Sequence, residues 1–259
     1  MNQGYDPIKL TTIIRDVVVR IEGNTELRKY YRFRGGRWYG GIATADSVGC
    51  NLKCRFCWSW RVRDRASQIG KFYTPQQVVS KLLAIARRRG YRQVRISGGE
   101  PTLSMNHLVK VLELLEAESP RTLFILETNG ILIGFNKDYA KMLSKFRNVH
   151  VRVSLKGCTE QEFHILTGAK PDAFNLQLQA LKNLLDVGVS THPAVMLSFS
   201  TEKSVKKLIE RLRDIDKSLV EEFEEEYVFL YPHVKEILKK FGLKPKIAFS
   251  PNNIPEELI

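Results

Sequence analysis

Three of the four cysteines in this 259-residue chain stand close together, as Cys50, Cys54 and Cys57. In an intracellular chain, thiols this close favour metal ligation or redox chemistry over disulfides. A cubane iron–sulfur cluster has four irons, so three thiolates leave one iron open to a substrate or cofactor. Structural zinc normally takes four protein ligands, and Cys158 could complete a zinc site only through the fold. The spacing therefore favours a cluster with an open iron.

The elements that must position these thiols alternate regularly after residue 40. Short β-branched or aromatic stretches predict strands over residues 41–48, 93–97, 123–127, 149–155, 189–197 and 225–231. Apolar residues at helical spacing lie between them, and Thr74 followed by Pro75 predicts a helix start. Further helices are expected over residues 137–145, 173–187, 204–214 and 234–241. Repeated strand–helix units of this kind form a parallel α/β sheet.

Polar motifs follow the predicted strands at equivalent places. The cysteine loop follows the first strand, SGGEP (97–101) closes the second, ETNG (127–130) closes the third and SLKG (154–157) closes the fourth. Parallel α/β folds assemble their active sites at these carboxyl ends. We therefore expect the motifs to meet at one site.

The cysteine spacing, with the aromatic Phe56 before the last cysteine, resembles the radical S-adenosylmethionine (SAM) superfamily. The resemblance implies a [4Fe–4S] cluster on Cys50, Cys54 and Cys57, whose open iron chelates S-adenosylmethionine. One electron from the cluster then cleaves the cofactor to give a 5′-deoxyadenosyl radical. The implied fold is an open, partial (β/α)6 TIM-like barrel.

The same resemblance implies contacts between the chain and S-adenosylmethionine. Phe56 would flank the adenine, Gly98, Gly99 and Glu100 would lie beside the methionine amino group, and Thr128 and Asn129 would reach the sugar or amino acid part. Two glycines allow the backbone to approach a ligand closely, and Glu100 or an exposed carbonyl can accept from an ammonium group.

Within the superfamily, SLKG resembles the strand-four motif of the glycyl-radical-enzyme activases, such as the pyruvate formate-lyase activating enzyme. Lys156 would meet the cofactor carboxylate, although Ser154 replaces the expected aspartate. His192 would contact the ribose. Residues 160–169 and 231–245 extend the resemblance, which covers about residues 41–249. It implies an enzyme that abstracts hydrogen from a partner protein.

Charge favours a different substrate. The chain carries a formal net charge of +13, which suits a polyanion such as RNA. The Phe-Cys-Trp cluster ending is similar to that of wybutosine-synthesis enzymes, and the basic, aromatic residues 28–39 either stack RNA bases or form a packed hairpin. Modification of tRNA is therefore an alternative, and a non-enzymatic metal-binding protein is a third. Trp58, Trp60, Arg61 and Arg63 after the loop either cover the site or pack.

We expect three segments: an N-terminal extension over residues 1–40, a radical SAM core domain over 41–249 and a C-terminal tail over 250–259. An electron donor such as ferredoxin or flavodoxin is the expected partner. No apolar run approaches the roughly 20 residues of a membrane span, so we do not expect a membrane partner. We expect the protein to be cytoplasmic.

Overall fold

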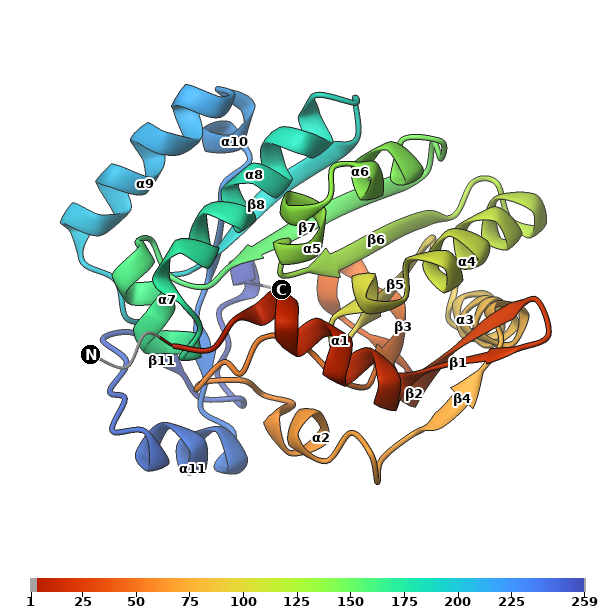
Figure 1. The fold of residues 1–259 in the computed structure, drawn as a ribbon, viewed down its shortest axis with the longest axis horizontal. Helices are drawn as coiled ribbons and strands as arrows, with labels where there is room; N and C mark the ends of the chain where they lie inside the picture. Colours follow the sequence, from red (N-terminus) through yellow and green to blue (C-terminus); the bar gives the residue numbers. More distant parts are fainter. Residues whose placement is uncertain (1–3, 259) are drawn as a thin grey trace.

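Six parallel strands form the centre of the computed structural model, which describes residues 4–258 (Figure 1). In hydrogen-bonded order they are β3 (Ile42–Ser47), β5 (Gln93–Ser97), β6 (Leu123–Thr128), β7 (Val149–Leu155), β8 (Ser190–Met196) and β9 (Glu224–Glu226). Helices connect successive strands, which confirms the predicted alternation. The strand order follows the chain and ends at β9, so the sheet is the open, partial (β/α)6 barrel that was predicted.

The N-terminal residues extend this sheet. Their elements, with a short strand that joins them, are α1 (Pro7–Val18), β1 (Val19–Glu22), β2 (Thr25–Gly36), η1 (Trp38–Gly40) and β4 (Lys71–Tyr73). β2 pairs antiparallel with β1, β3 and β4. The hairpin was predicted, whereas α1 was not. Asp6 is the N-cap of α1, because its carboxylate accepts from the Ile8 N–H at 2.9 Å. Residues 1–3 and 259 of the predicted extension and tail lie outside the described residues.

Helices cover one face of the sheet (Figure 1). They are α3 (Pro75–Arg89), α4 (Met105–Glu118), α5 (Ile131–Phe135), α6 (Asp138–Leu143), α7 (Glu160–Thr167), α8 (Phe174–Leu185), α9 (Glu202–Ile215) and α10 (Ser218–Glu221), while α2 (Trp60–Asp64) and α11 (Pro232–Lys240) lie elsewhere. Short 3-10 turns are η2 (Pro101–Ser104), η3 (Pro171–Ala173) and η4 (Glu256–Leu258). α3 begins as predicted, because Thr74 and Gln77 form a capping box. Among residues 4–258, no helix has both the length and the apolar character of a bilayer span.

The strands divide their side chains between an apolar and a polar face. On β7, Val151 and Val153 are buried in the apolar core, whereas Arg152 and Ser154 alternate with them and make polar contacts. The same alternation on neighbouring strands gives the inner face Asp46, Arg95, Glu127, His150, His192, Glu224 and Glu226. The barrel interior is therefore lined by charged and hydrogen-bonding groups.

The sixth strand is shorter than the predicted range of residues 225–231. β9 ends at Glu226, and β10 (Val228–Phe229) then pairs with β11 (Ala248–Phe249) in a separate two-stranded sheet. The Val228 N–H donates to the Ser198 hydroxyl at 2.8 Å, so the chain after β9 bonds to a side chain of the loop that follows β8 instead of continuing the backbone ladder. A side-chain acceptor from another loop thus ends the strand, a contact that the local sequence does not reveal.

Candidate functional site

The loop after β5 is fixed onto the end of β3 by backbone hydrogen bonds. The Gly99 N–H donates to the Ser47 carbonyl oxygen at 2.9 Å. The Glu100 N–H donates to the Gly49 carbonyl oxygen at 2.8 Å. Gly98 has a φ of +88°, and a Cβ on Gly99 would collide with the Gly49 carbonyl oxygen. Glycine is required at both positions, and it lets SGGEP lie directly against the start of the cysteine loop.

The cysteine loop follows β3, and all four cysteines of the described chain are free thiols. The Leu52 N–H lies 3.4 Å and the Asn129 side-chain amide 3.6 Å from Cys50 Sγ. Cys57 Sγ lies 3.5 Å from the Ser59 hydroxyl. Weak donors of this kind orient a sulfur without blocking it as a ligand.

The fourth cysteine, Cys158, lies apart from the other three. Residues 4–258 contain no three Cys, His, Asp or Glu side chains gathered closely enough to ligate one metal ion. Each thiolate of a cubane binds a different iron, so cluster ligands lie farther apart than the ligands of one ion. Cys158 lies beside Ser200 and Glu162 instead of completing a zinc site. Cys158 is therefore not a fourth ligand at the cysteine loop, and a cluster on Cys50, Cys54 and Cys57 stays a prediction.

Burial gives the thiols of Cys50 and Cys54 a strong preference for their protons, because it raises the pKa of each. It raises the pKa of Cys54 to about 11, an effect that Lys156 partly offsets. Burial, and then Glu100 and Cys54, raise the pKa of Cys50 further. A bound metal would compensate the buried negative charge and replace the protons. The loop thus suits thiolate ligation rather than free thiolate reactivity.

Glu100 is 2% exposed and lies at the centre of a hydrogen-bond cluster. Its Oε1 accepts from the hydroxyls of Thr102 and Thr128, each at 2.7 Å. Its Oε2 accepts from the Asn129 N–H at 2.8 Å. The carboxylate therefore ties the loop after β5 to the end of β6, and its predicted contact with an amino group stays a prediction.

Thr128 and Asn129 are buried where β6 ends. The Thr128 hydroxyl accepts from the Gly130 N–H at 3.1 Å. Asn129 donates to Asn51 Oδ1 at 2.8 Å and accepts from the Ile131 N–H at 3.0 Å. ETNG is thus brought onto the cysteine loop, as the strand-end argument predicted, while contact with the sugar of a cofactor stays a prediction.

Lys156 and Ser154 form a polar group at the end of β7. Lys156 Nζ lies 2.5 Å from Ser154 Oγ, which donates to Glu226 at 2.6 Å. Glu226 of β9 therefore brings a carboxylate beside Ser154 and Lys156. Gln177, fully buried on α8, accepts from the Lys156 N–H at 3.1 Å and donates to the Ser154 carbonyl oxygen at 2.9 Å. Sequence reasoning missed Gln177, because a lone glutamine on a helix carries no signal.

His192 belongs to a network across the inner face. Its Nε2 lies 2.8 Å from Glu224 and its Nδ1 lies 2.6 Å from His150 Nε2. Arg152 donates to the same Glu224 through two nitrogens, at 2.7 and 2.5 Å. Burial alone would raise the pKa of Glu224, but hydrogen bonds from Arg152 and His192 outweigh that effect and lower the pKa to about 2. The histidine is therefore held by protein groups, and its predicted ribose contact stays a prediction.

Aromatic and basic residues of the cysteine loop pack against other elements. Phe56 is 8% exposed, and its ring centroid lies 5.9 Å from that of Phe199. The Trp60 indole donates to the His233 carbonyl oxygen of α11 at 2.8 Å. Arg63 donates to the carbonyl oxygen of Cys54 at 2.8 Å. Trp60 and Arg63 thus hold the loop in place, which was one of the two roles considered for them.

Two arginines on the inner face of β2 were not among the predicted site residues. Asp46, fully buried on β3, accepts from Arg32 Nε at 2.6 Å and from Arg34 Nε at 2.8 Å. The Arg32 guanidinium also lies 5.7 Å from the ring centroid of Trp58, which is 40% exposed and follows the cysteines. The two arginine side chains are 43% and 25% exposed. Their alternation on one strand was the signal that could have identified them.

Similarity to known proteins extends these observations. Residues 45–212 match the family model of the Radical SAM superfamily. The chain is 28% identical over 158 residues to a probable GTP 3′,8-cyclase of Saccharolobus solfataricus, covering 60% of this chain and 47% of that protein. It is 27% identical over 217 residues to a probable GTP 3′,8-cyclase of Methanococcus maripaludis, covering 80% and 69%. The chain spans about half the length of most of the curated relatives it matches.

A solved structure shares the fold. SuiB of Streptococcus suis, bound to S-adenosylmethionine, has a TM-score of 0.55 at 18% identity, covering 81% of this chain and 46% of SuiB. Members of the matched family bind a [4Fe–4S] cluster and S-adenosylmethionine, and they generate radicals from that cofactor with an electron from a donor. With the family model spanning most of the barrel and the thiols, glycines and strand ends assembled as described, this chain belongs to the radical SAM superfamily and is a radical SAM enzyme.

Proposed function

We propose that this enzyme holds its cluster on Cys50, Cys54 and Cys57 and removes a hydrogen atom from a small, nucleotide-like anion. When bound, the cluster supplies the electron that breaks the S–C5′ bond of S-adenosylmethionine. The observation that carries the substrate class is the accessible guanidinium pair of Arg32 and Arg34 beside the cysteine loop. The products of the first stage are methionine and 5′-deoxyadenosine, the latter formed by the hydrogen transfer.

The proposed contacts of S-adenosylmethionine come from the strand ends. We assign them to Phe56, Gly98, Gly99, Glu100, Thr128, Asn129, Ser154, Lys156 and His192. Lys156 offers a cation for the cofactor carboxylate, and Glu226 beside it limits how far that lysine can move. The cluster of bonds around Glu100 and the bridge made by Gln177 fix these loops relative to one another, which favours a preorganised site.

The geometry of the arginine pair favours a phosphorylated substrate. Asp46 accepts from Nε of Arg32 and from both Nε and Nη2 of Arg34, the last at 3.3 Å, which leaves the terminal nitrogens of Arg32 and Nη1 of Arg34 for another acceptor. A guanidinium presents planar donors that match phosphate oxygens. Trp58, partly exposed beside Arg32, offers an aromatic face on which a base can stack. Phosphate and base recognition in one place is what a nucleotide requires.

The relatives support the same class. The two curated relatives described above are named probable GTP 3′,8-cyclases, after a small nucleotide. Because the chain spans about half the length of most such relatives, the proposal extends to a nucleotide substrate and not to the cyclisation itself. These names favour a small molecule over the partner protein that the activase resemblance implied.

The packing of the N-terminal hairpin also weakens the RNA alternative. Tyr30 is 2% exposed, and its ring centroid lies 5.7 Å from that of Phe33. Phe33 in turn packs edge-on against Tyr73 at 5.1 Å. These aromatic side chains stabilise the hairpin and are not free to stack RNA bases, so the packed-hairpin interpretation accounts for them.

Nucleotide-dependent hydrogen transfer tests this proposal. With reduced, reconstituted enzyme and S-adenosylmethionine, adding GTP as the probe should raise 5′-deoxyadenosine formation at least about tenfold, because a held substrate supplies the hydrogen. Arg34→Ala should remove most of that stimulation, whereas Arg89→Ala at the end of α3 should keep it. An equal rate with and without GTP, ATP, CTP and UTP would overturn the substrate class.

A further inference from the structure

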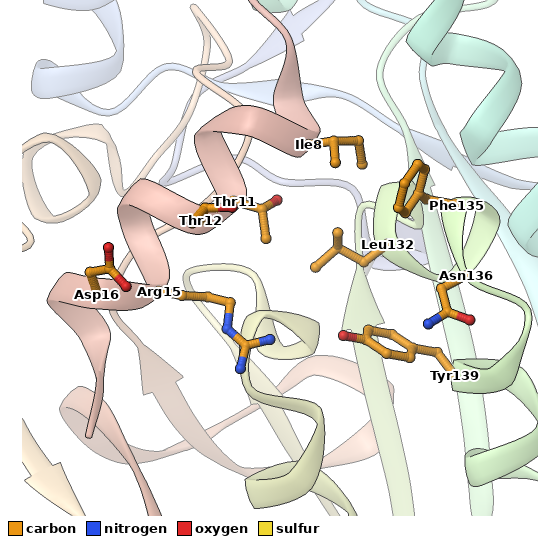
Figure 2. Close-up of a pocket in the computed structure, with 9 residues that line it drawn as sticks. All are labelled: Ile8, Thr11, Thr12, Arg15, Asp16, Leu132, Phe135, Asn136 and Tyr139. Carbon is orange, nitrogen blue, oxygen red and sulfur yellow. The ribbon is translucent and has the colours of Figure 1, made fainter. Parts of the chain in front are cut away.

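A hollow of about 360 Å³ separates α1 from α5 and α6 (Figure 2). Arg15 and Thr11 line it from α1, and Leu132, Phe135 and Tyr139 line it from the other side. In Figure 2 the Arg15 guanidinium and the Tyr139 hydroxyl both point into the space between the helices. The hollow lies among helices on the outside of the barrel, so it is separate from the proposed substrate site on the inner face.

The α1 wall of this hollow is connected to the cysteine loop. The Thr11 hydroxyl accepts from Asn51 Nδ2 at 3.1 Å, and Asn51 is covalently bonded to Cys50. Asn51 Oδ1 accepts from Asn129 Nδ2 at 2.8 Å, and the same amide lies 3.6 Å from Cys50 Sγ. Two short routes of bonds and hydrogen bonds therefore lead from the wall of the hollow to the first cysteine.

Helix α1 is the layer of protein between this surface and the loop. It packs onto Gly49, where an added Cβ would lie 2.8 Å from a methyl group of Ile14 and 2.9 Å from one of Val18. Gly49 directly precedes Cys50. A donor seated against α1 would therefore approach the cluster loop across the width of one helix.

We infer that this hollow is the docking site of the one-electron donor, a small carrier protein with an acidic face. This inference goes beyond the proposed substrate, and it depends on Cys50 as a cluster ligand. One electron passes from the reduced carrier to the oxidised cluster, so the carrier is oxidised by one electron and no atoms are exchanged. Superfamily members require such a donor, and the short routes to Cys50 are the reason to place it here.

Charge around the hollow selects an acidic partner. α1 and the start of α6 carry the cationic side chains of Lys9, Arg15, Lys137 and Lys141 against the carboxylates of Asp16 and Asp138. Arg15 pairs with Glu26 at 3.9 Å and Lys141 with Asp138 at 2.8 Å, whereas Lys9 and Lys137 make no ion pair within residues 4–258 and supply the positive excess. The whole chain has a formal net charge of +13. Complementary charge steers encounter between redox partners and accelerates association at low salt.

An exposed aromatic residue supplies the apolar part of the surface. Phe135, at the end of α5, is 61% exposed and lines the hollow. Ile8 and Leu132 line the same hollow. Apolar side chains grouped at one hollow, unlike a single exposed one, are typical of interaction sites, and transient redox complexes use small interfaces. Because Phe135 is already exposed, its replacement should leave folding intact, which makes it the position to test.

Stopped-flow reduction of the cluster, followed by its visible absorbance, tests the inference with no nucleotide present. Reduced flavodoxin is the protein donor and dithionite is the small chemical donor. Phe135→Asp should slow reduction by flavodoxin about tenfold, because it removes the apolar anchor and repels an acidic partner. Reduction by dithionite should keep its rate, and raised salt should slow the flavodoxin reaction of the natural chain.

Ile21→Asp is the matched control, since Ile21 on β1 is 72% exposed and gains the same charge. It should leave both reductions unchanged. Equal flavodoxin rates for Phe135→Asp and Ile21→Asp would overturn the docking site. Slowed reduction by dithionite in Phe135→Asp would overturn it as well, because the residue would then act on the cluster itself. Neither result bears on the nucleotide proposal, whose test uses 5′-deoxyadenosine formation.

Discussion

The Glu100 carboxylate accepts a hydrogen bond from the Thr128 hydroxyl at 2.7 Å, and this contact joins the loop after β5 to the end of β6. The Asn129 N–H donates to the same carboxylate at 2.8 Å. These two strand ends carry the glycines and the asparagine that lie against the cysteine loop. The buried Glu100 carboxylate thus holds these two strand ends together, in addition to any contact that it makes with a ligand.

Glu100→Gln should therefore destabilise the protein. An amide presents N–H donors where the carboxylate accepts, so the Asn129 N–H or the hydroxyls would lose a buried partner. We expect the free energy of unfolding to fall by roughly 2 kcal/mol, the cost of an unsatisfied buried polar group. Chemical denaturation of the purified protein measures the change.

Glu202→Gln is the control for that measurement, because Glu202 is exposed in the first turn of α9. Its loss should cost no more than about 1 kcal/mol, through the helix dipole. Equal effects of the two substitutions would show that the Glu100 hydrogen bonds contribute nothing to stability.

Comparing Gly99→Ala with Gly188→Ala should distinguish the cost of a steric collision from the cost of backbone strain alone. A Cβ on Gly99 would meet the Gly49 carbonyl oxygen, and backbone cannot move aside cheaply. A Cβ on Gly188 would meet nothing within 4 Å, although its φ of +73° disfavours a side chain. We expect Gly188→Ala to cost about 1–2 kcal/mol, and Gly99→Ala to cost more and to prevent cluster assembly. Normal iron content in Gly99→Ala would contradict this account of the SGGEP loop.

Much of this architecture could be predicted from the sequence, because local patterns determine it. Thr74 and Pro75 predicted the start of α3, and five of the six parallel strands lie where β-branched and aromatic stretches indicated. The polar motifs could be placed together because carboxyl ends of parallel strands share one edge of a sheet. The cysteine spacing alone indicated an open iron.

Contacts between distant strands could not be predicted in this way. Ser154 and Glu226 meet because β7, β8 and β9 pair in one particular register, and no local signal links positions 72 residues apart. Asp46 joins Arg32 and Arg34 only because β2 pairs antiparallel with β3. A one-residue change of register would turn each of these side chains to the other face.

His107 should make stability depend on pH. The Tyr30 hydroxyl lies 3.0 Å from its Nε2 and the Glu26 carbonyl oxygen lies 2.8 Å from its Nδ1, which suits a neutral ring. Burial lowers the pKa of His107 to about 4, against an ordinary value of 6.5. Between these values the unfolded chain binds the proton and the folded chain does not. Stability is therefore complete above pH 6.5 and falls as the pH drops toward 4.

The expected loss from this one group is on the order of 3 kcal/mol at pH 4. Denaturation at several pH values should show it as a steeper decline in the natural chain than in His107→Gln, which lacks the titrating ring. Parallel stability curves for the two proteins over pH 4–6.5 would contradict the buried neutral histidine.

The most direct test of the central claim measures cluster absorbance and 5′-deoxyadenosine in oxygen-free, reconstituted enzyme reduced by dithionite with S-adenosylmethionine. We predict both signals in the natural chain and in Cys158→Ala, since Cys158 lies beside Glu162 and Ser200 rather than in the cysteine loop. Cys54→Ala should lose both. A cluster and 5′-deoxyadenosine retained in Cys54→Ala, or no 5′-deoxyadenosine from natural enzyme that carries its cluster, would contradict the account.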